Sequence, residues 1–248
     1  MPEEKTQRSA LDFFPDRITY TSLKESAKGC MGCDLYKIGT QTVFGEGDLH
    51  SPVMFVGEAP GDAEDIEGHP FVGPAGKLFD RALADAGIDR GHSYLTNVVK
   101  HFKWKPRGKR RIHEKPRVSE IDACLPWLGA EIGLVQPDVL VCLGATAAQA
   151  LLGKDFRVTK QRGVWLESEH AERTIATVHP SSILRAPDQE TRERQYEEFV
   201  KDLKTVAAEL AAIEAIRQKD EQRRPATVRQ PGPVRGRRRT GTNTSRSP

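Results

Sequence analysis

The sequence predicts an α/β protein: a three-layer α/β/α sandwich around a central, mainly parallel, four-stranded sheet. Four short runs are continuously apolar, which is typical of strands buried on both faces of a parallel sheet. Helical patterns lie between these runs, and such alternation favours this class. With 248 residues, 37% of them apolar, the chain is long enough for one domain with a full core.

The elements are expected in a regular order. The strands are PVMFV, SYLTNVV, VLVCL and TIATV, at residues 52–56, 93–99, 139–143 and 174–178. Helices are expected over 76–86, 119–135 and 145–152, and a long charged helix over 189–218 closes the domain. Ser119 is the expected N-cap of the second helix, which stops before Pro137.

Charge is distributed unevenly along the chain. Residues 217–248 carry ten Lys and Arg against two acids, a balance of +8, so the other 216 residues hold −5 of the total of +3. This segment has few large apolar residues and is predicted to be a disordered basic tail. It either holds the protein near nucleic acid or acts as a solubilising extension. The other expected parts are an N-terminal extension over 1–21 and a folded domain over 22–216.

The sequence gives no sign of a membrane protein. No stretch approaches 18 consecutive apolar residues, and the first residues lack the apolar run of a secretory signal. We therefore expect a soluble protein of the cytoplasm with no membrane contact.

The cysteines are candidates for a metal or cluster site; they are Cys30, Cys33, Cys124 and Cys142. The C-x-x-C spacing of the first pair lets two thiolates bind one metal or cluster. The second pair lies in a predicted helix and a predicted strand, unlike the tight second pair of a zinc ribbon. On the residues alone, zinc and an iron–sulfur cluster both stay open. A redox pair with two small core residues is the other alternative.

Polar motifs accompany all four predicted strands. GEAPGD (57–62) follows the first strand, and the second holds Asn97 and leads towards the basic segment GKRRIHEKPR (108–117), which is expected to be a loop. GATAAQ (144–149) and HPSS (179–182) follow the other two. In open parallel sheets, ligands bind at the carboxyl ends of the strands. We therefore expect these motifs to form one site.

Several motifs together carry a family resemblance. GEAPGD, PFVGPAG (70–76), TNVVK (96–100), VHPS (178–181) and the cysteine spacing resemble the uracil-DNA glycosylase superfamily, nearest to its iron–sulfur-containing family four, over residues 22–210. The segment KRRIH (109–113) resembles the signature of the UdgX branch, which excises uracil and stays covalently attached to the DNA through that histidine. UdgX sequences often carry Gln after the GE of the first motif, where this chain has Ala59.

The resemblance implies roles in catalysis and base recognition. The catalytic residues would be Glu58, Asp62, His113 and His179. Of these, His179 would donate to the uracil oxygen on which charge collects, and the carboxylates would lie near the sugar. Phe71 would stack on the flipped uracil and Asn97 would select its edge, with the base-binding site completed by His179, Gly57 and Ala59.

The resemblance also implies a cofactor and a partner. The DNA-binding residues would be Lys109, Arg110, Arg111, Ser181 and Ser182. The four cysteines would hold a mainly structural [4Fe-4S] cluster. The substrate would be uracil-containing DNA, preferably single-stranded, bound by a monomer at the nucleoid.

The chemistry gives His113 a specific task. Breaking the C1′–N1 bond leaves positive charge on the sugar, and a neutral imidazole held at C1′ is a better nucleophile than water. We expect the positive field of the basic segment to lower the pKa of His113 and keep it unprotonated. Glu58 would fix its tautomer.

Three other functions are weighed against this one. In an ordinary multiple-turnover glycosylase, water attacks the sugar and His113 only contacts DNA. A non-catalytic iron–sulfur or zinc nucleic-acid-binding module would not need the converging polar residues. A metal-dependent hydrolase would use Asp62, Asp65, His69 and His179, which lack a recognisable ligand spacing.

Overall fold

The computed structural model describes residues 8–223. Contacts divide the chain into two units, 1–211 and 212–248. Within the described residues, the second unit consists of the last part of one helix. The expected basic tail of 217–248 falls partly outside the described residues, and its residues 217–223 belong to that helix. No helix of residues 8–223 is long and apolar enough to cross a membrane.

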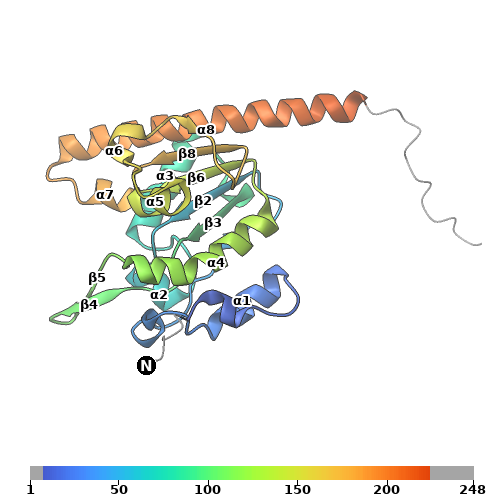
Figure 1. Cartoon of the computed structure of the whole chain (residues 1–248). Coiled ribbons are helices and arrows are strands. Elements are labelled where there is room, and N and C mark those ends of the chain that lie inside the picture. The colour runs from blue at the N-terminus through green and yellow to red at the C-terminus, as the bar shows by residue number, and fades with distance from the viewer. Residues whose placement is uncertain (1–7, 224–248) are drawn as a thin grey trace, which may run out of the picture. The chain divides into compact units, whose positions relative to one another are not determined.

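The first unit is an α/β sandwich, which confirms the predicted fold class (Figure 1). The strands are β1 (Glu46–Gly47), β2 (Val53–Gly57), β3 (Ser93–Asn97), β4 (Trp104–Arg107), β5 (Arg110–His113), β6 (Val139–Leu143), β7 (Trp165–Leu166) and β8 (Arg173–Thr177). The helices are α1 (Tyr20–Lys28), α2 (Asp62–Glu67), α3 (Pro74–Ala86), α4 (Val118–Val135), α5 (Ala145–Leu152), α6 (Val158–Gln161), α7 (Pro180–Leu184) and α8 (Gln189–Arg223). Three 3₁₀ turns cover Ala10–Phe13, Asp34–Lys37 and Arg90–His92.

The central sheet has six strands in the order β1-β3-β2-β6-β8-β7, so the predicted number of four is wrong. The four predicted strands form its parallel centre. The two additional strands, β1 and β7, are two-residue antiparallel edges. Strands of two residues are shorter than the runs of about four to eight that identify a strand, and this is why the sequence pattern does not reveal them.

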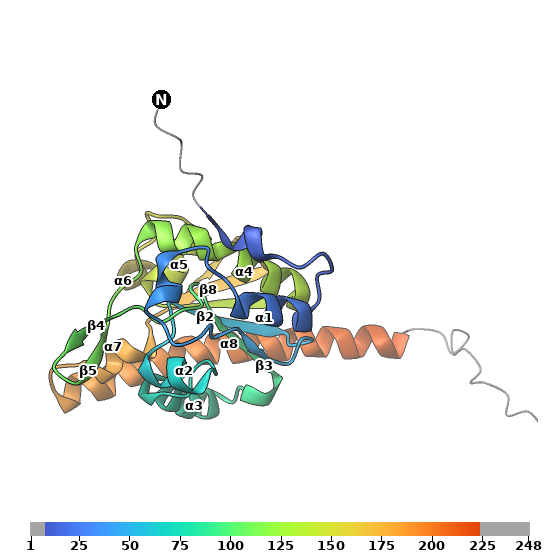
Figure 2. The same ribbon diagram turned by 90° about the horizontal axis from the view of Figure 1, so that it is seen from below.

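Helices cover both faces of the sheet (Figure 2). Alternate residues of each strand point to opposite faces. On one face, Met54 and Val56 of β2 belong to the core cluster that includes residues of α1, α4 and α5. On the other face, Phe55 packs against Phe79 of α3 at a ring distance of 5.0 Å, and Phe79 packs against Phe199 of α8.

The segment before α1 contributes to the first core. Ala10 is fully buried, and Phe14 stacks on Trp127 of α4 with ring centroids 4.6 Å apart. The part of the expected N-terminal extension that the structure describes is thus packed against α4.

Two local predictions need correction. Helix α4 begins at Val118 with Arg117 as N-cap, so Ser119 lies inside the helix rather than at its cap. The side chain of Glu120 accepts a hydrogen bond from the Arg117 backbone N–H and closes this end instead. The basic segment, expected as a loop, contains strand β5 and forms an antiparallel hairpin with β4. The charged residues of this segment form no apolar run, so the sequence pattern does not reveal the strand. Gly108, with φ of +60°, provides the tight turn between β4 and β5.

A buried ion pair joins α4 to the end of β3. The side chains of Lys100 and Glu131 are fully buried and bonded to each other. Lys100 also donates to Thr96 Oγ1 and to the backbone oxygen of Asn97, both at 2.7 Å. Glu131 accepts from the Gly45 backbone N–H at 2.8 Å. Each of the two buried charges thus has hydrogen-bond partners. The Lys100–Glu131 ion pair therefore holds the segment that carries Asn97 in place.

We expect Lys100→Met to lower the free energy of unfolding by roughly 3–5 kcal/mol, because it leaves the Glu131 charge buried without its partner. Lys24→Met is the matched control, since Lys24 pairs with Glu46 at the surface and should lose at most about 1 kcal/mol. Urea denaturation followed by circular dichroism measures both. Equal losses in the two variants would contradict this account of the buried pair.

Candidate active site

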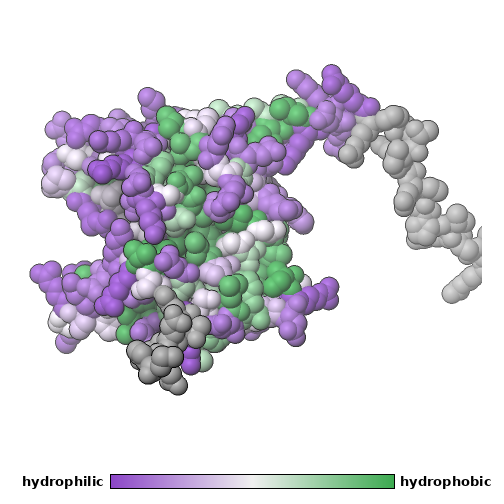
Figure 3. All heavy atoms as spheres, in the orientation of Figure 1, coloured by the Kyte–Doolittle hydropathy of each residue, from purple (hydrophilic) through white to green (hydrophobic). Residues whose placement is uncertain are grey.

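A cavity of about 820 Å³ opens at the carboxyl edge of the central sheet. Its walls come from the segments that follow β2, β6 and β8, from the end of β3 and from β5. The space-filling view shows the surface hollowed at its left edge, between the β4–β5 hairpin and the start of α8 (Figure 3). The polar motifs that accompany the four parallel strands therefore meet at this cavity.

Phe71 forms one wall and has a strained backbone. Its φ of +58° lies in the left-handed region, which costs a residue with a side chain roughly 1–2 kcal/mol. A Cβ on Gly76 would lie 1.8 Å from the Phe71 carbonyl oxygen, so only glycine fits at the start of α3. The ring of Phe71 is buried and lies nearly parallel to that of His179, with centroids 6.3 Å apart. Strain of this kind is typical of functional positions.

Asn97 enters the cavity beside Phe71 from the end of β3. Its amide is free to bind a ligand, because the hydrogen bonds described for this residue involve its backbone. Gly57 makes the arrangement possible: a Cβ there would lie 2.3 Å from Asn97 Oδ1 and 2.9 Å from the Phe71 ring. Gly57 thus serves the predicted base site through its lack of a side chain.

His179 caps helix α7 and has a defined tautomer. Its Nδ1 accepts a hydrogen bond from the Ser181 backbone N–H, which leaves the proton of the neutral ring on Nε2. Burial, together with the charges of Arg185 and His113, lowers the pKa of His179 to about 4. At neutral pH, His179 is therefore an uncharged donor through Nε2.

Arg111 fixes the hairpin that carries His113. Its guanidinium binds Asp62 and the buried Asp65, each at 2.6 Å, and lies over the rings of Phe102 and Trp104. Arg111 and Asp62 are thus engaged with each other. Neither lines the cavity that holds Glu58 and His113.

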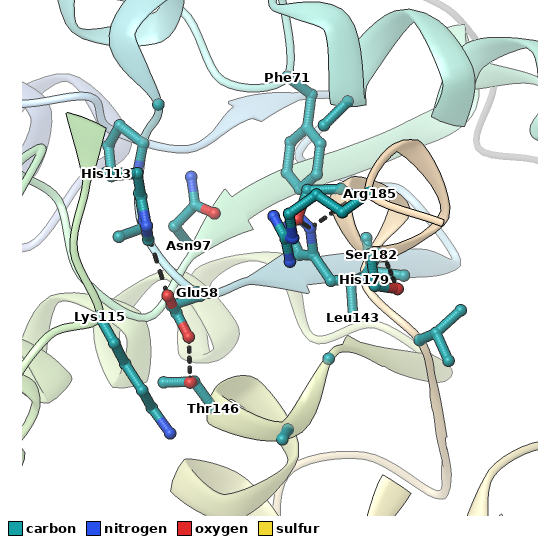
Figure 4. A pocket seen from close by; sticks show the side chains of 18 of the residues that line it. Glu58, Phe71, Asn97, His113, Lys115, Leu143, Thr146, His179, Ser182 and Arg185 are labelled. Atoms are coloured by element: carbon teal, nitrogen blue, oxygen red, sulfur yellow. Dashed lines mark hydrogen bonds and ion pairs between the residues drawn. The ribbon is translucent and has the colours of Figure 1, made fainter. Parts of the chain in front are cut away.

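His113, at the end of β5, faces Glu58 on one side of the cavity (Figure 4). Its Nε2 lies 3.6 Å from Glu58 Oε1, within range of an ion pair but longer than a hydrogen bond. The other oxygen of Glu58 accepts a hydrogen bond from Thr146 of α5. Phe71, His179 and Arg185 lie on the opposite side of the cavity from this row of residues (Figure 4).

The pKa of His113 is lowered, as predicted, but the cause differs. Burial is the largest cause, and Arg185 adds to it, whereas Glu58 acts in the opposite direction. The cations of the basic segment are not among the main causes; its Glu114 acts in the opposite direction, and its Arg111 is paired with Asp62 and Asp65.

The other predicted DNA contacts lie at and beside the cavity. Lys109 and Arg110 are exposed on the hairpin and do not line it. Ser181 and Ser182 line it, and their hydroxyls bond to His179, at Nδ1 and at the backbone oxygen respectively. Sequence reasoning missed Ile112, Lys115, Thr146, Val158, Thr159 and Arg185, which also line the cavity. For Thr146, the signal was its place in the motif that follows β6.

The four cysteines are free thiols in or beside the core. Cys30, Cys124 and Cys142 belong to one buried cluster, and Cys33 packs against it. Two of the sulfurs accept hydrogen bonds, Cys124 from the Lys100 backbone N–H and Cys30 from the Trp127 indole, both at 3.3 Å. Within residues 8–223, no three His, Cys, Asp or Glu side chains are grouped to hold a metal ion.

Comparisons with known proteins point to one enzyme superfamily. The model of the uracil DNA glycosylase superfamily matches residues 44–204. The chain is 39% identical over 180 residues to a type-4 uracil-DNA glycosylase of Thermotoga maritima, covering 72% of this chain and 90% of the relative. Type-4 enzymes of Sulfurisphaera tokodaii and Pyrobaculum aerophilum are 37% and 38% identical, over 67% and 66% of this chain and 76% and 84% of theirs.

The chain therefore belongs to the uracil DNA glycosylase superfamily. Its similarity to type-4 enzymes supports the family-four resemblance of the sequence motifs.

Proposed function

We propose that this uracil-DNA glycosylase, after excising uracil, is captured covalently on the abasic sugar by His113. The supporting observation is the position of His113 in the cavity: its imidazole faces Glu58, opposite the pair formed by Phe71 and His179. A nucleotide bound between these two sides would present its base to one and its sugar to the other.

Base recognition would use the wall formed by Phe71 and Asn97. Flipping a nucleotide out of the stack costs a few kcal/mol, least in single-stranded DNA, which is the substrate form we propose. Stacking on Phe71 would offset roughly 1–3 kcal/mol of this cost. The free amide of Asn97 would hydrogen-bond the uracil edge.

His179 would stabilise the leaving base. As the C1′–N1 bond breaks, its electron pair moves onto uracil and charge collects on the ring oxygens. The Nε2–H of the neutral His179 would donate to that oxygen. A donor placed in this way contributes about 3 kcal/mol.

His113 would then form the new bond. The lone pair of its unprotonated ring nitrogen bonds to C1′, which replaces the broken bond to N1. The imidazole becomes a cation and gives its remaining N–H proton to Glu58, while uracil takes a proton from solvent. An alkylated imidazole is a poor leaving group, so the adduct would persist.

We further propose that the four cysteines bind a [4Fe-4S] cluster. The four cysteines supply the four thiolates that such a cluster needs, and three of them belong to the buried core cluster. The motifs that resemble the iron–sulfur-containing family four favour this cluster over zinc. When bound, the cluster would serve as a cross-link between the N-terminal segment, α4 and β6.

The alternative within the same family is attack by water. Ala59, at the position where UdgX sequences often have Gln, and the similarity to type-4 enzymes favour it. His113 would then contact only DNA.

We expect a uracil-dependent band that survives SDS and heat when the protein is mixed with a uracil-containing single-stranded oligonucleotide. His113→Ala should abolish this band, because no ring nitrogen remains to bond to C1′. Denaturing gel electrophoresis measures it, and alkaline cleavage of the same samples counts free abasic sites.

The controls are a thymine oligonucleotide and His92→Ala, which removes an exposed histidine outside the cavity. Free abasic sites without any band from the wild-type protein would make water the nucleophile. Neither band nor abasic sites would refute the glycosylase function.

Capture should also depend on pH through His113. Because burial lowers its pKa below 6.5, the imidazole stays neutral and nucleophilic to more acidic pH than a free histidine. As the pH is lowered from 8, the fall in the rate of adduct formation should therefore be centred below pH 6.5. Single-turnover kinetics measure this rate, and a fall centred above pH 6.5 would contradict the proposed environment of His113.

Metal analysis tests the cluster. We expect about four iron atoms per chain in protein purified without oxygen, with a matching amount of sulfide. Cys33→Ser should lose iron and lower the melting temperature. Met31→Ser, a change in the same loop that removes no thiol, is the control and should lose neither. Zinc in place of iron would overturn the assignment.

A further inference from the structure

The carboxylate of Glu58 has two oxygens with different surroundings. Oε2 accepts a hydrogen bond from Thr146 Oγ1, and Oε1 lies 3.6 Å from His113 Nε2 (Figure 4). The three residues thus form a row, with the hydroxyl at one end and the imidazole at the other. This row resembles other sites in which a third group orients the base that acts on a nucleophile.

Thr146 is well suited to hold a carboxylate in place. It lies in the first turn of α5 and is 4% exposed, and its β-branched side chain has little rotational freedom. The free N–H groups at the start of a helix also favour a nearby anion. Glu58, by contrast, follows β2 on an unbranched side chain that is 23% exposed and has three rotatable bonds.

The start of α5 is itself fixed to the site. Gly144, with φ of +92°, donates a backbone hydrogen bond to Thr177 at the end of β8. A Cβ at Gly144 would lie 2.9 Å from the Cβ of His179. The segment that positions Thr146 is therefore in contact with the segment that positions His179.

We propose that Thr146 is a positioning residue whose hydroxyl holds Glu58 with Oε1 directed at His113. With Oε2 occupied, the free oxygen faces the imidazole and accepts its proton as the ring nitrogen bonds to C1′. Without the hydroxyl, the carboxylate rotates and the imidazole loses its orientation. Water then competes for C1′. This inference rests on the proposed capture by His113, and it adds that Thr146 sets the balance between capture and release.

The test compares three variants. Thr146→Val keeps the shape and removes the hydroxyl, Thr146→Ser keeps the hydroxyl, and Thr205→Val makes the same change at a threonine of α8 that does not line the cavity. Single-turnover reactions with a uracil oligonucleotide give the rate of total excision and the ratio of adduct to free abasic sites. Melting temperatures check that each variant is folded.

We expect Thr146→Val to slow adduct formation by up to about a hundredfold and to shift product towards free abasic sites, because a misplaced catalytic group has an effect of this order. Thr146→Ser should restore the wild-type ratio, and Thr205→Val should leave both rate and ratio unchanged. A purely structural role would lower the melting temperature of Thr146→Val without changing the ratio.

Two results would overturn the proposal: Thr146→Val behaving like Thr205→Val, or Thr146→Ser losing as much adduct formation as Thr146→Val. If the wild-type protein forms no adduct, the capture by His113 is refuted on its own. In that case the rate of total excision tests the role of Thr146. A slower rate in Thr146→Val alone would support its action on Glu58, and a rate equal to that of the wild-type protein would overturn the proposal.

Discussion

The parallel register of four strands is the constraint on which the site depends. β2 pairs with β3 and with β6, and β6 pairs with β8, so all four strands end at one edge of the sheet. Residues far apart in the sequence then meet at atomic distances. The crowding is so tight that Gly57 and Gly144 have no room for a Cβ. Each of these glycines is therefore part of the site although neither has a side chain.

The hairpin that carries His113 lies outside this sheet and needs its own attachment. Arg111 provides it by binding Asp62 and Asp65 at the start of α2 while its guanidinium covers two aromatic rings. The exposed cations of the hairpin, such as Lys109 and Arg110, remain available to phosphates. A segment that looks uniformly basic in the sequence thus divides its charges between an internal anchor and the surface.

The two histidines of the cavity differ through their surroundings. His179 is held by a backbone N–H on one nitrogen, and its pKa of about 4 keeps it neutral, so it can only act as a donor through the other nitrogen. His113 is partly exposed and faces a carboxylate, which suits the nucleophile role that we propose for it. Under that proposal, one histidine of the cavity acts as a hydrogen-bond donor and the other as a nucleophile.

The sequence by itself determined the four parallel strands, the helices between them and the edge at which ligands bind, because these follow from apolar runs and from what comes after each run. It also singled out Phe71, Asn97, His113 and His179 as members of one site. Only the tertiary structure decided which charges face each other. Arg111 binds Asp62 instead of lining the cavity, and Thr146 donates a hydrogen bond to Glu58. The charge of Arg185 lowers the pKa of both histidines. Such pairings depend on how segments from different strands approach at the sheet edge, and no local pattern of residues encodes that distance.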